Sequence, residues 1–373
     1  MNVPKLRFKE FNDEWISQKL FQLVEFSKGN ILAKADLDET GNYPCILYGQ
    51  LYTKYNEVIR EIYSKTNRNE NNIPKSKRGD ILIPSSGETP IDISTSSCIQ
   101  IDNVLLGGDI NILRPISCDG RFLSYLINNN KKTEIAKLAQ GHSVVHLYND
   151  NLKQVSINIP SIQEQKRISD TLELLDKKIE LQSKKIEDLK LFKKGLFNII
   201  FNNLTNVKKY KLGELCNITT GKLDANAMVE NGKYRFYTCA REYSFIDKYV
   251  FDTEALLISG NGAYVGYIHY YKGKFNAYQR TYVLYNFSQN IQFIKCYLDK
   301  NLSKRISLEK KEGNTPYIVL STLTDMIIKI PSKENQIKIS NIINCHNKKI
   351  ELEENKLLKL QELKKGLMQS MFV

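Results

Sequence analysis

The chain has 373 residues, of which 25% are charged and 42% hydrophobic, and a formal net charge of +13 at pH 7; this length predicts two or three domains, and this charge favours nucleic acid as a partner. A proteome rich in solvated lysines would give the same charge. No run of apolar residues approaches the roughly 18 that a membrane-spanning helix requires, the N-terminus lacks the apolar core of a signal peptide, and the seven cysteines form no CxxC pair, so we expect a cytoplasmic protein with reduced thiols, no membrane partner and no zinc site.

Residues 1–159 are predicted to form a first globular domain of the α/β (α+β) class. Within it, residues 79–84 have the pattern of a turn followed by a buried strand. A further strand is expected at 110–113 and a helix at 121–128. Residues 65–78 are basic and polar, and we expect them to form an exposed loop.

Two polar segments of this domain are candidates for DNA contact. One, at 85–90, follows the predicted strand, and the other, at 141–143, precedes a long helix. Binding residues concentrate in loops held by a rigid scaffold, and small polar side chains match base edges in the major groove. The domain has only 19 Lys and Arg against 18 Asp and Glu, so local cations would have to contact phosphates. The predicted DNA-binding residues are Lys54, Lys75, Lys77, Arg78, Ser85, Ser86, Glu88, Thr89, His142 and Ser143.

Residues 160–203 are predicted to form a long helix, which would measure about 60 Å. Ser161 stands at the N-cap position, and Glu164, three residues later, completes the pattern of a capping box. Apolar positions then recur at steps of four and three, which is the spacing of a coiled-coil seam. The seam positions are Ile168, Leu172, Leu175, Ile179, Gln182, Ile186, Leu189, Lys193 and Leu196.

Residues 204–330 are predicted to form a second globular domain, which is more basic, with 18 Lys and Arg against 11 Asp and Glu. A strand at 255–259 ends in the glycine-containing loop 260–264, and further elements are expected as a strand at 281–284 and a helix at 292–299. Arginines interleaved with tyrosines suit phosphate contact and stacking. The alternative is structural: most tyrosines are expected to pack on strands, and Arg241 or Arg280 could each pair with a nearby carboxylate. The predicted DNA-binding residues are Arg241, Asn261, Tyr264, Arg280, Asn314 and Thr315.

Residues 331–373 repeat the first long helix. Over 43 aligned positions at a constant offset of 171 residues, 18 are identical, including the segments KKIEL and LKKGL. The two globular domains match more loosely, so the chain is a tandem of globule, helix, globule and helix. Neither helix can bury its apolar stripe alone, and the simplest partner of each is the other. A helix of another protein is the alternative partner.

Motifs for catalysis or cofactor binding are absent from the sequence. There is no phosphate-binding loop and no NPPY-like motif of the kind with which aminomethyltransferases hold a flipped adenine. The glycines at 260–266 lead into strand-like sequence rather than a helix, which argues against a dinucleotide site. The four histidines have no metal spacing. We therefore predict no catalytic residue and no metal site.

With these features the chain resembles the specificity subunits of type I restriction–modification systems. The resemblance rests on the paired PSxxEQ-like helix starts, the paired KKIEL and LKKGL segments, and the opening PKLRF followed by a tryptophan and KL. It covers the whole chain. It implies that each globule is a target-recognition domain, and that the long helices pair antiparallel between the globules in an internal pseudo-two-fold repeat.

The resemblance also implies a function without catalysis. Each domain would read one half of a split, asymmetric site in double-stranded DNA, while the helices set the spacing and dock two methyltransferase (modification) subunits. S-adenosylmethionine, ATP and Mg would belong to those subunits and to the restriction/translocase subunits, so this chain would bind no cofactor itself. The alternatives are a stand-alone DNA-modifying enzyme and a coiled-coil adaptor that does not contact DNA.

Overall fold

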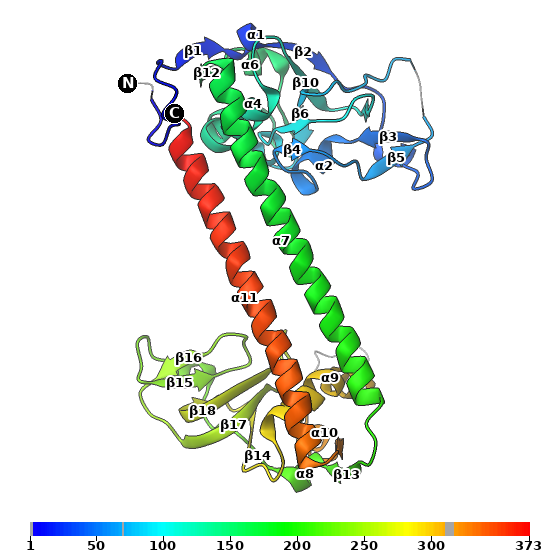
Figure 1. Ribbon diagram of the computed structural model, residues 1–373, viewed down its shortest axis with the longest axis vertical. Coiled ribbons are helices and arrows are strands. Elements are labelled where there is room, and N and C mark those ends of the chain that lie inside the picture. The colour runs from blue at the N-terminus through cyan, green and yellow to red at the C-terminus, as the bar shows by residue number, and fades with distance from the viewer. Residues whose placement is uncertain (1–2, 69–70, 310–316) are drawn as a thin grey trace. The chain divides into compact units, whose positions relative to one another are not determined.

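The computed structural model describes residues 3–68, 71–309 and 317–373. They form two compact units, most of whose elements are labelled in Figure 1. The first unit comprises Met1–Ser183 with Asn355–Val373, and the second comprises Lys184–Glu354. Each unit therefore contains one globule and a part of each long helix.

The two long helices match the predicted ones to within two residues at each end: α7 covers Ile162–Asn202 and α11 covers Lys333–Met371. The serine before each helix is its N-cap, because the Ser161 hydroxyl accepts the Glu164 N–H and the Ser332 hydroxyl accepts the Asn335 N–H, each at 3.4 Å.

The predicted capping box at the start of α7 is only half formed. The carboxylate of Glu164 does not turn back to its own helix start. It accepts two hydrogen bonds of 2.8 Å from the Arg7 guanidinium instead. Glu164 is buried, and a buried carboxylate gains more from a bidentate arginine than from one backbone N–H. This ion pair fixes the N-terminal segment to α7.

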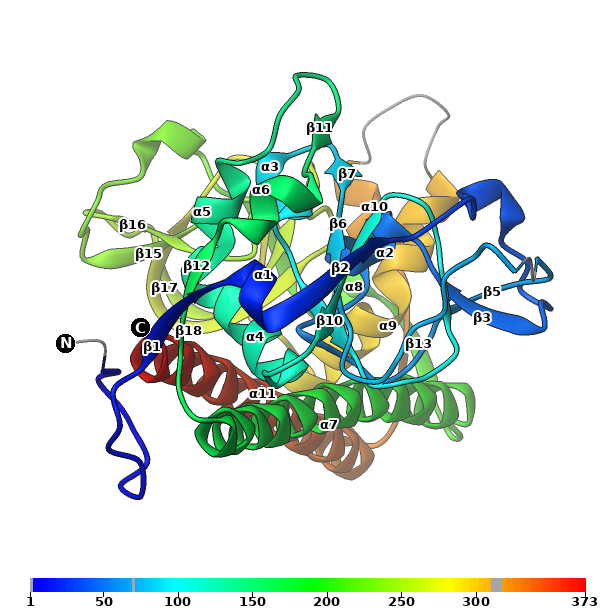
Figure 2. The ribbon, with the colours of Figure 1, turned by 90° about the horizontal axis from the view of Figure 1, so that it is seen from above.

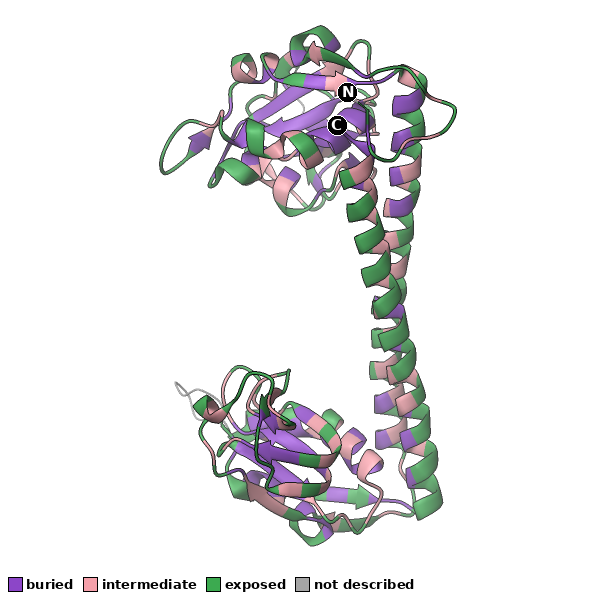
Figure 3. Cartoon of the chain, turned by 90° about the vertical axis from the view of Figure 1, so that its left-hand side faces the viewer, coloured by how far each residue is buried: buried purple, intermediate pink, exposed green. Residues whose placement is uncertain are grey.

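The first unit is built around a five-stranded sheet in the order β2-β10-β6-β8-β4. Ile81 and Ile83 pack into the core that contains α4 and the start of α7, whereas Leu82 packs into a second core on the other face. This alternation follows from the two-residue period of a strand, and Figure 3 shows the buried strands. The elements are β1 (Ile16–Lys19), α1 (Leu20–Leu23), β2 (Val24–Lys28), η1 (Lys34–Asp36), β3 (Tyr43–Ile46), α2 (Tyr48–Thr53), β4 (Val58–Ile59), β5 (Ser64–Thr66), β6 (Ile81–Pro84), β7 (Ser86–Gly87), α3 (Pro90–Ile93), β8 (Ser97–Ile99), β9 (Leu105–Leu106), β10 (Ile110–Pro115), α4 (Gly120–Leu126), the π-helical turn η2 (Ile127–Lys131), α5 (Lys132–Ala136), β11 (Val145–His146), α6 (Asn149–Lys153) and β12 (Ser156–Ile159).

The expectation of an exposed loop at 65–78 is wrong in part. Its first residues belong to β5, which pairs with β3. Ile73 and Ser76 are buried, and Ser76 bonds to the backbone of Ile101 and Val104. Positions 69 and 70 lie outside the described residues.

The second unit repeats this plan with a six-stranded sheet in the order β14-β19-β17-β18-β15-β16. Leu256 and Ile258 face the core under α9, whereas Leu257 faces a smaller core on the other side. The predicted strands at 255–259 and 281–284 are confirmed within β17 and β19. The elements are β13 (Lys208–Lys211), α8 (Leu212–Leu215), β14 (Asn217–Thr220), η3 (Ala225–Ala227), β15 (Tyr234–Tyr237), β16 (Ser244–Ile246), β17 (Phe251–Ser259), β18 (Ile268–Ala277), β19 (Thr281–Tyr285), α9 (Ile291–Glu309), α10 (Leu320–Thr324) and β20 (Ile327–Ile330).

Within each unit the helix segments pack antiparallel, as predicted. In the second unit Lys185 Nζ lies 2.9 Å from Glu353 Oε1, and further along α7 the Phe192 ring lies 5.1 Å from the His346 ring. Rising numbers on α7 therefore meet falling numbers on α11. In the first unit Leu172 shares a core with Met371, the last residue of α11, and with Phe372, which follows it. The seam that the 4-and-3 spacing predicted faces inward: Ile168, Leu172, Leu175 and Ile186 are buried, and Ile179, Leu189 and Leu196 are half-buried.

One glutamine holds each helix pair to its globule. Gln165 Nε2 donates to the Pro160 carbonyl at 2.8 Å, and its Oε1 accepts the N–H of Asp119 at the start of α4. Gln336 makes the same two bonds to Pro331 and to Asn290 at the start of α9. The identity of these glutamines in the sequence repeat thus has a structural cause.

Candidate nucleic-acid interface

In the first unit, the two polar segments predicted to contact DNA lie side by side. Strand β7 pairs antiparallel with β11, with Ser86 opposite His146 (Figure 2). The Ser85 carbonyl accepts the Leu147 N–H at 2.9 Å. This pairing puts the exposed residues Glu88 and Thr89 beside the exposed turn that contains His142 and Ser143. We call this end of the sheet the first reading end.

Not all the residues predicted there can reach a ligand. Ser85 and Ser86 are only 7% and 4% exposed. We therefore correct this part of the prediction: these two residues hold the loop in place, and their side chains are not accessible to DNA. Thr89 is the N-cap of α3, since its hydroxyl accepts the Asp92 N–H at 3.2 Å. Glu88, His142 and Ser143 remain exposed.

In the second unit, the corresponding loops meet in the same way. The Gly260 N–H donates to the Arg280 carbonyl at 2.9 Å, and the Gly260 carbonyl accepts the Ile318 N–H at 2.8 Å. A side chain at position 260 would clash, because a Cβ there would lie 2.3 Å from the Arg280 oxygen. Asn261 forms a β-bridge with Tyr317. We call this end of the sheet the second reading end.

The second reading end carries two exposed arginines, one of which rests on an aromatic ring. The Arg241 guanidinium lies 5.2 Å from the centre of the Tyr264 ring, a cation–π contact. Arg280 is exposed at the turn before β19. Neither arginine forms an ion pair with a described carboxylate. The structure therefore brings together Arg241, Asn261, Tyr264 and Arg280, while Asn314 and Thr315 lie outside the described residues.

The lysines and the arginine predicted for the first unit do not join its reading end. Lys77 and Arg78 precede β6, whereas the reading end follows it, and a four-residue strand separates its ends by about 13 Å. Lys75 is bridged to Leu105, and Lys54 ends α2 and lines a groove with Lys364. Their spacing along the chain does not indicate which end of a strand they occupy.

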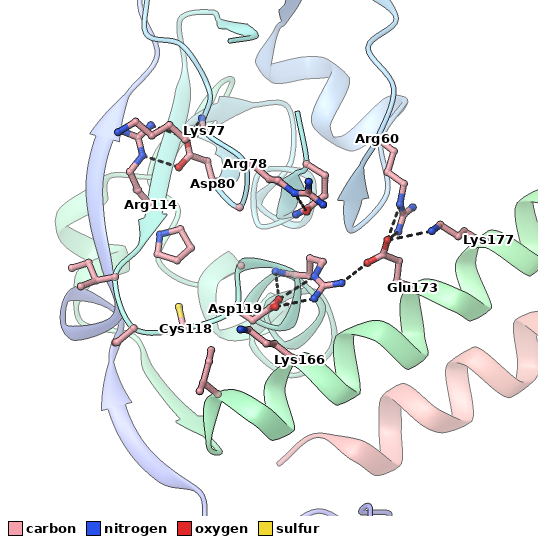
Figure 4. A pocket seen from close by; sticks show the side chains of 18 residues that line it. Arg60, Lys77, Arg78, Asp80, Arg114, Cys118, Asp119, Lys166, Glu173 and Lys177 are labelled. Carbon is pink, nitrogen blue, oxygen red and sulfur yellow. Dashed lines mark hydrogen bonds and ion pairs between the residues drawn. The ribbon is translucent and has the colours of Figure 1, made fainter. Parts of the chain in front are cut away.

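Lys77 and Arg78 line a cavity of about 1040 Å³ between the globule and the first turns of α7 (Figure 4). Its other arginines are held by carboxylates. Arg114 binds Asp80, while Arg60 and Arg121 share Glu173 at 2.8 and 2.6 Å. Burial alone would raise the pKa of Glu173, but the hydrogen bonds from Arg121 and Arg60 outweigh it and hold this pKa below its ordinary value. The network anchors the globule on α7.

Arg235 is a candidate that the prediction omitted. Its guanidinium lies 4.2 Å from the Tyr243 ring centre and 4.5 Å from that of Tyr271, so aromatic rings hold it in place. It forms no ion pair with a described carboxylate, and it is half-buried on β15, the strand that leads to Arg241. The alternation Tyr234-Arg235-Phe236-Tyr237 was the available signal, since period two places Arg235 and Tyr237 on one face.

The described residues contain no group of three or more side chains that could hold a metal ion. In the same ranges, no helix is long and apolar enough to cross a membrane.

A family model for the type I restriction modification DNA specificity domain matches residues 12–191 and again residues 205–362. The chain belongs to this family. It is a specificity subunit of a type I restriction–modification system, and its role there is the recognition of DNA sequence, as the resemblance predicted. The two matches each contain one reading end.

Known specificity subunits are similar in sequence and fold. The EcoDI specificity subunit of Escherichia coli is 37% identical over 163 residues, which are 44% of this chain and only 36% of that protein. A putative type I specificity subunit of Mycoplasma pneumoniae, S.MpnORF638P, is 25% identical over 99% of both chains. The crystal structure of the M. genitalium S subunit superposes with a TM-score of 0.74 at 20% identity, covering 100% of this chain and 99% of that one. The predicted fold class is thereby confirmed.

Proposed function

We propose that this specificity subunit is a non-catalytic DNA reader in which each reading end recognises one half of a split, asymmetric target. The main support is that the two ends share a backbone scaffold but not their side chains. The same pair of hydrogen bonds closes the loops at Ser85 and at Gly260, whereas the exposed residues around them differ. Two different readers on one chain require two different half-sites.

The long helices would set the spacing between the two half-sites and dock two methyltransferase subunits. Restriction/translocase subunits would then bind to this complex. Leu181 and Leu352 occupy the same position in the two copies of the repeat and are 67% and 62% exposed. A single exposed leucine is ordinary on a protein surface, but an exposed leucine at the same position of both repeat copies suits a partner that binds each copy in the same way. S-adenosylmethionine, ATP and Mg would be bound by the partner subunits.

Domain exchange tests independent reading. Residues 15–159 are replaced by the first domain of another family member, and the methylated sequences are determined in cells that express the complete system. We expect one half of the target to change and the other to stay. The reciprocal replacement of residues 204–330 should change the other half, and a change of both halves by either exchange would contradict separate readers.

Two simpler experiments test the alternatives. If the chain were an enzyme by itself, the purified protein would methylate or cleave DNA when S-adenosylmethionine, ATP and Mg are supplied; we expect neither product. If it were only an adaptor, a gel-shift assay with the modification subunit present would show no dependence on this chain. We expect a shift that weakens as salt rises, because phosphate contacts release counterions.

A further inference from the structure

The two reading ends have opposite hydrogen-bonding chemistry at one matched position. Asp109 precedes β10 and Arg280 precedes β19, at the same offset of 171 residues that relates the long helices. The Asp109 carbonyl accepts the Ser85 N–H at 2.8 Å, just as the Arg280 carbonyl accepts the Gly260 N–H at 2.9 Å. The two residues therefore occupy equivalent places on the scaffold.

A second pair of matching hydrogen bonds, made by the residue after each of these two, supports the equivalence of Asp109 and Arg280. The Ile110 carbonyl accepts the Gly29 N–H at 2.8 Å, and the Thr281 carbonyl accepts the Gly221 N–H at 3.2 Å. The same pair of backbone hydrogen bonds therefore holds both ends. The ends differ in their side chains and in one backbone angle at the matched position, because Asp109 has a φ of 58° and Arg280 does not have a positive φ.

Both side chains are exposed and have no described ion-pair partner. An ionised aspartate can only accept hydrogen bonds, whereas an arginine can only donate them. Their neighbours extend the contrast: Glu88 is exposed at the first reading end, and Arg241 lies at the second. At this matched position the first end thus presents an acceptor and the second a donor.

We infer that the second reading end recognises a G·C pair through guanine, and that the first recognises a base amino group. This inference rests on the proposed function. Arg280 would donate two hydrogen bonds to guanine O6 and N7. Asp109 would accept one from cytosine N4 or adenine N6, because a carboxylate next to DNA is repelled by the phosphates and is stabilised only by a donor.

The experiment compares methylated sequences in cells that express the complete system with wild-type chain, Arg280→Ala or Asp109→Ala. In both positions the backbone carbonyl makes the structural bond, so Arg280→Ala should preserve the fold. Asp109 has a φ of 58°, which asparagine adopts at a lower cost than alanine, so Asp109→Asn is the variant that leaves this turn unstrained. Arg280→Gln and Asp109→Asn serve as second variants, and glutamine should favour adenine where arginine read guanine. Lys209→Ala and Glu14→Ala, which remove exposed charges outside the reading ends, are the matched controls.

We expect Arg280→Ala to lose discrimination about 10- to 100-fold at one G·C position of one half-site. Asp109→Ala should relax one position of the other half-site, and the controls should keep the wild-type target. The inference is overturned if Arg280→Ala lowers methylation at all sites while keeping the target, if Asp109→Ala leaves its half-site intact, or if both relax the same half. If removal of the chain leaves methylation unchanged, the proposed function itself fails.

Discussion

The charge cluster at the end of α11 allows a test of how the first unit is held together. Lys364 Nζ lies 2.9 Å from Glu57 Oε2 and 2.7 Å from Asp176 Oδ1, so it joins α11 to the globule and to α7. The fully buried Tyr125 donates its hydroxyl hydrogen to Asp176. Lys364→Met keeps most of the side-chain volume but leaves both carboxylates without their cation.

We expect this substitution to cost about 3 kcal/mol of unfolding free energy. Removing one partner of a buried ion pair costs about 3–5 kcal/mol. The low end applies because the Lys364, Glu57 and Asp176 side chains keep 19%, 19% and 17% of their exposure. With a urea dependence of about 1–3 kcal/mol per M, the midpoint should fall by about 1–3 M.

The fluorescence of Trp15 measures this effect in the correct unit. Trp15 is the only tryptophan of the chain, and it is buried in the first unit against Phe122, which also contacts Phe372 of the C-terminal segment. Lys365→Met, which removes the neighbouring exposed lysine, is the control. Equal midpoints for the two variants would refute the reasoning.

A triple variant and the pH dependence test the same cluster. Adding Glu57→Gln and Asp176→Asn to Lys364→Met should restore most of the stability, because no buried charge is then unpaired. The second unit already has Asn347 at the position equivalent to Asp176. Burial alone would lower the pKa of Lys364, but the charges of Glu57 and Asp176 outweigh it and raise this pKa. The contribution is therefore present below pH 10.5 and lost as pH rises through the folded pKa.

Three further predictions concern the seam, the cavity network and the second reading end. Leu175→Asp should destabilise the first unit by several kcal/mol, since a charge would be buried without a partner, whereas Leu174→Asp, at a position 57% exposed, should leave the Trp15 transition nearly unchanged. Glu173→Gln should remove stabilisation that is present above about pH 4.3 and lost as pH falls through the lowered folded pKa, so the urea midpoints of variant and wild type should converge in acid. Gly260→Ala should push the Arg280 turn away and weaken DNA binding on the order of tenfold, with unchanged far-UV circular dichroism; unchanged binding would contradict the role of this contact.

The long helices, their seam and the tandem organisation could all be predicted from the sequence alone. The 4-and-3 spacing and the constant offset of 171 residues are local or periodic signals, and α7, α11 and their buried stripe follow from them. The strands at 81–84 and 281–284 were equally predictable, because each is a short apolar run after a turn.

Which polar residues act together depends on contacts between distant parts of the chain. Ser85 and Ser86 read as loop residues but are buried, because β11 pairs with β7 across a long sequence separation. Lys77 and Arg78 lie seven or more residues before Ser85 and look like neighbours of it, yet β6 places them at the other end of the sheet. Glu164 binds Arg7, which lies 157 positions away in the sequence, instead of completing the capping box. Each outcome depends on which distant backbone or side chain offers the stronger hydrogen bond, and a single sequence does not contain that comparison.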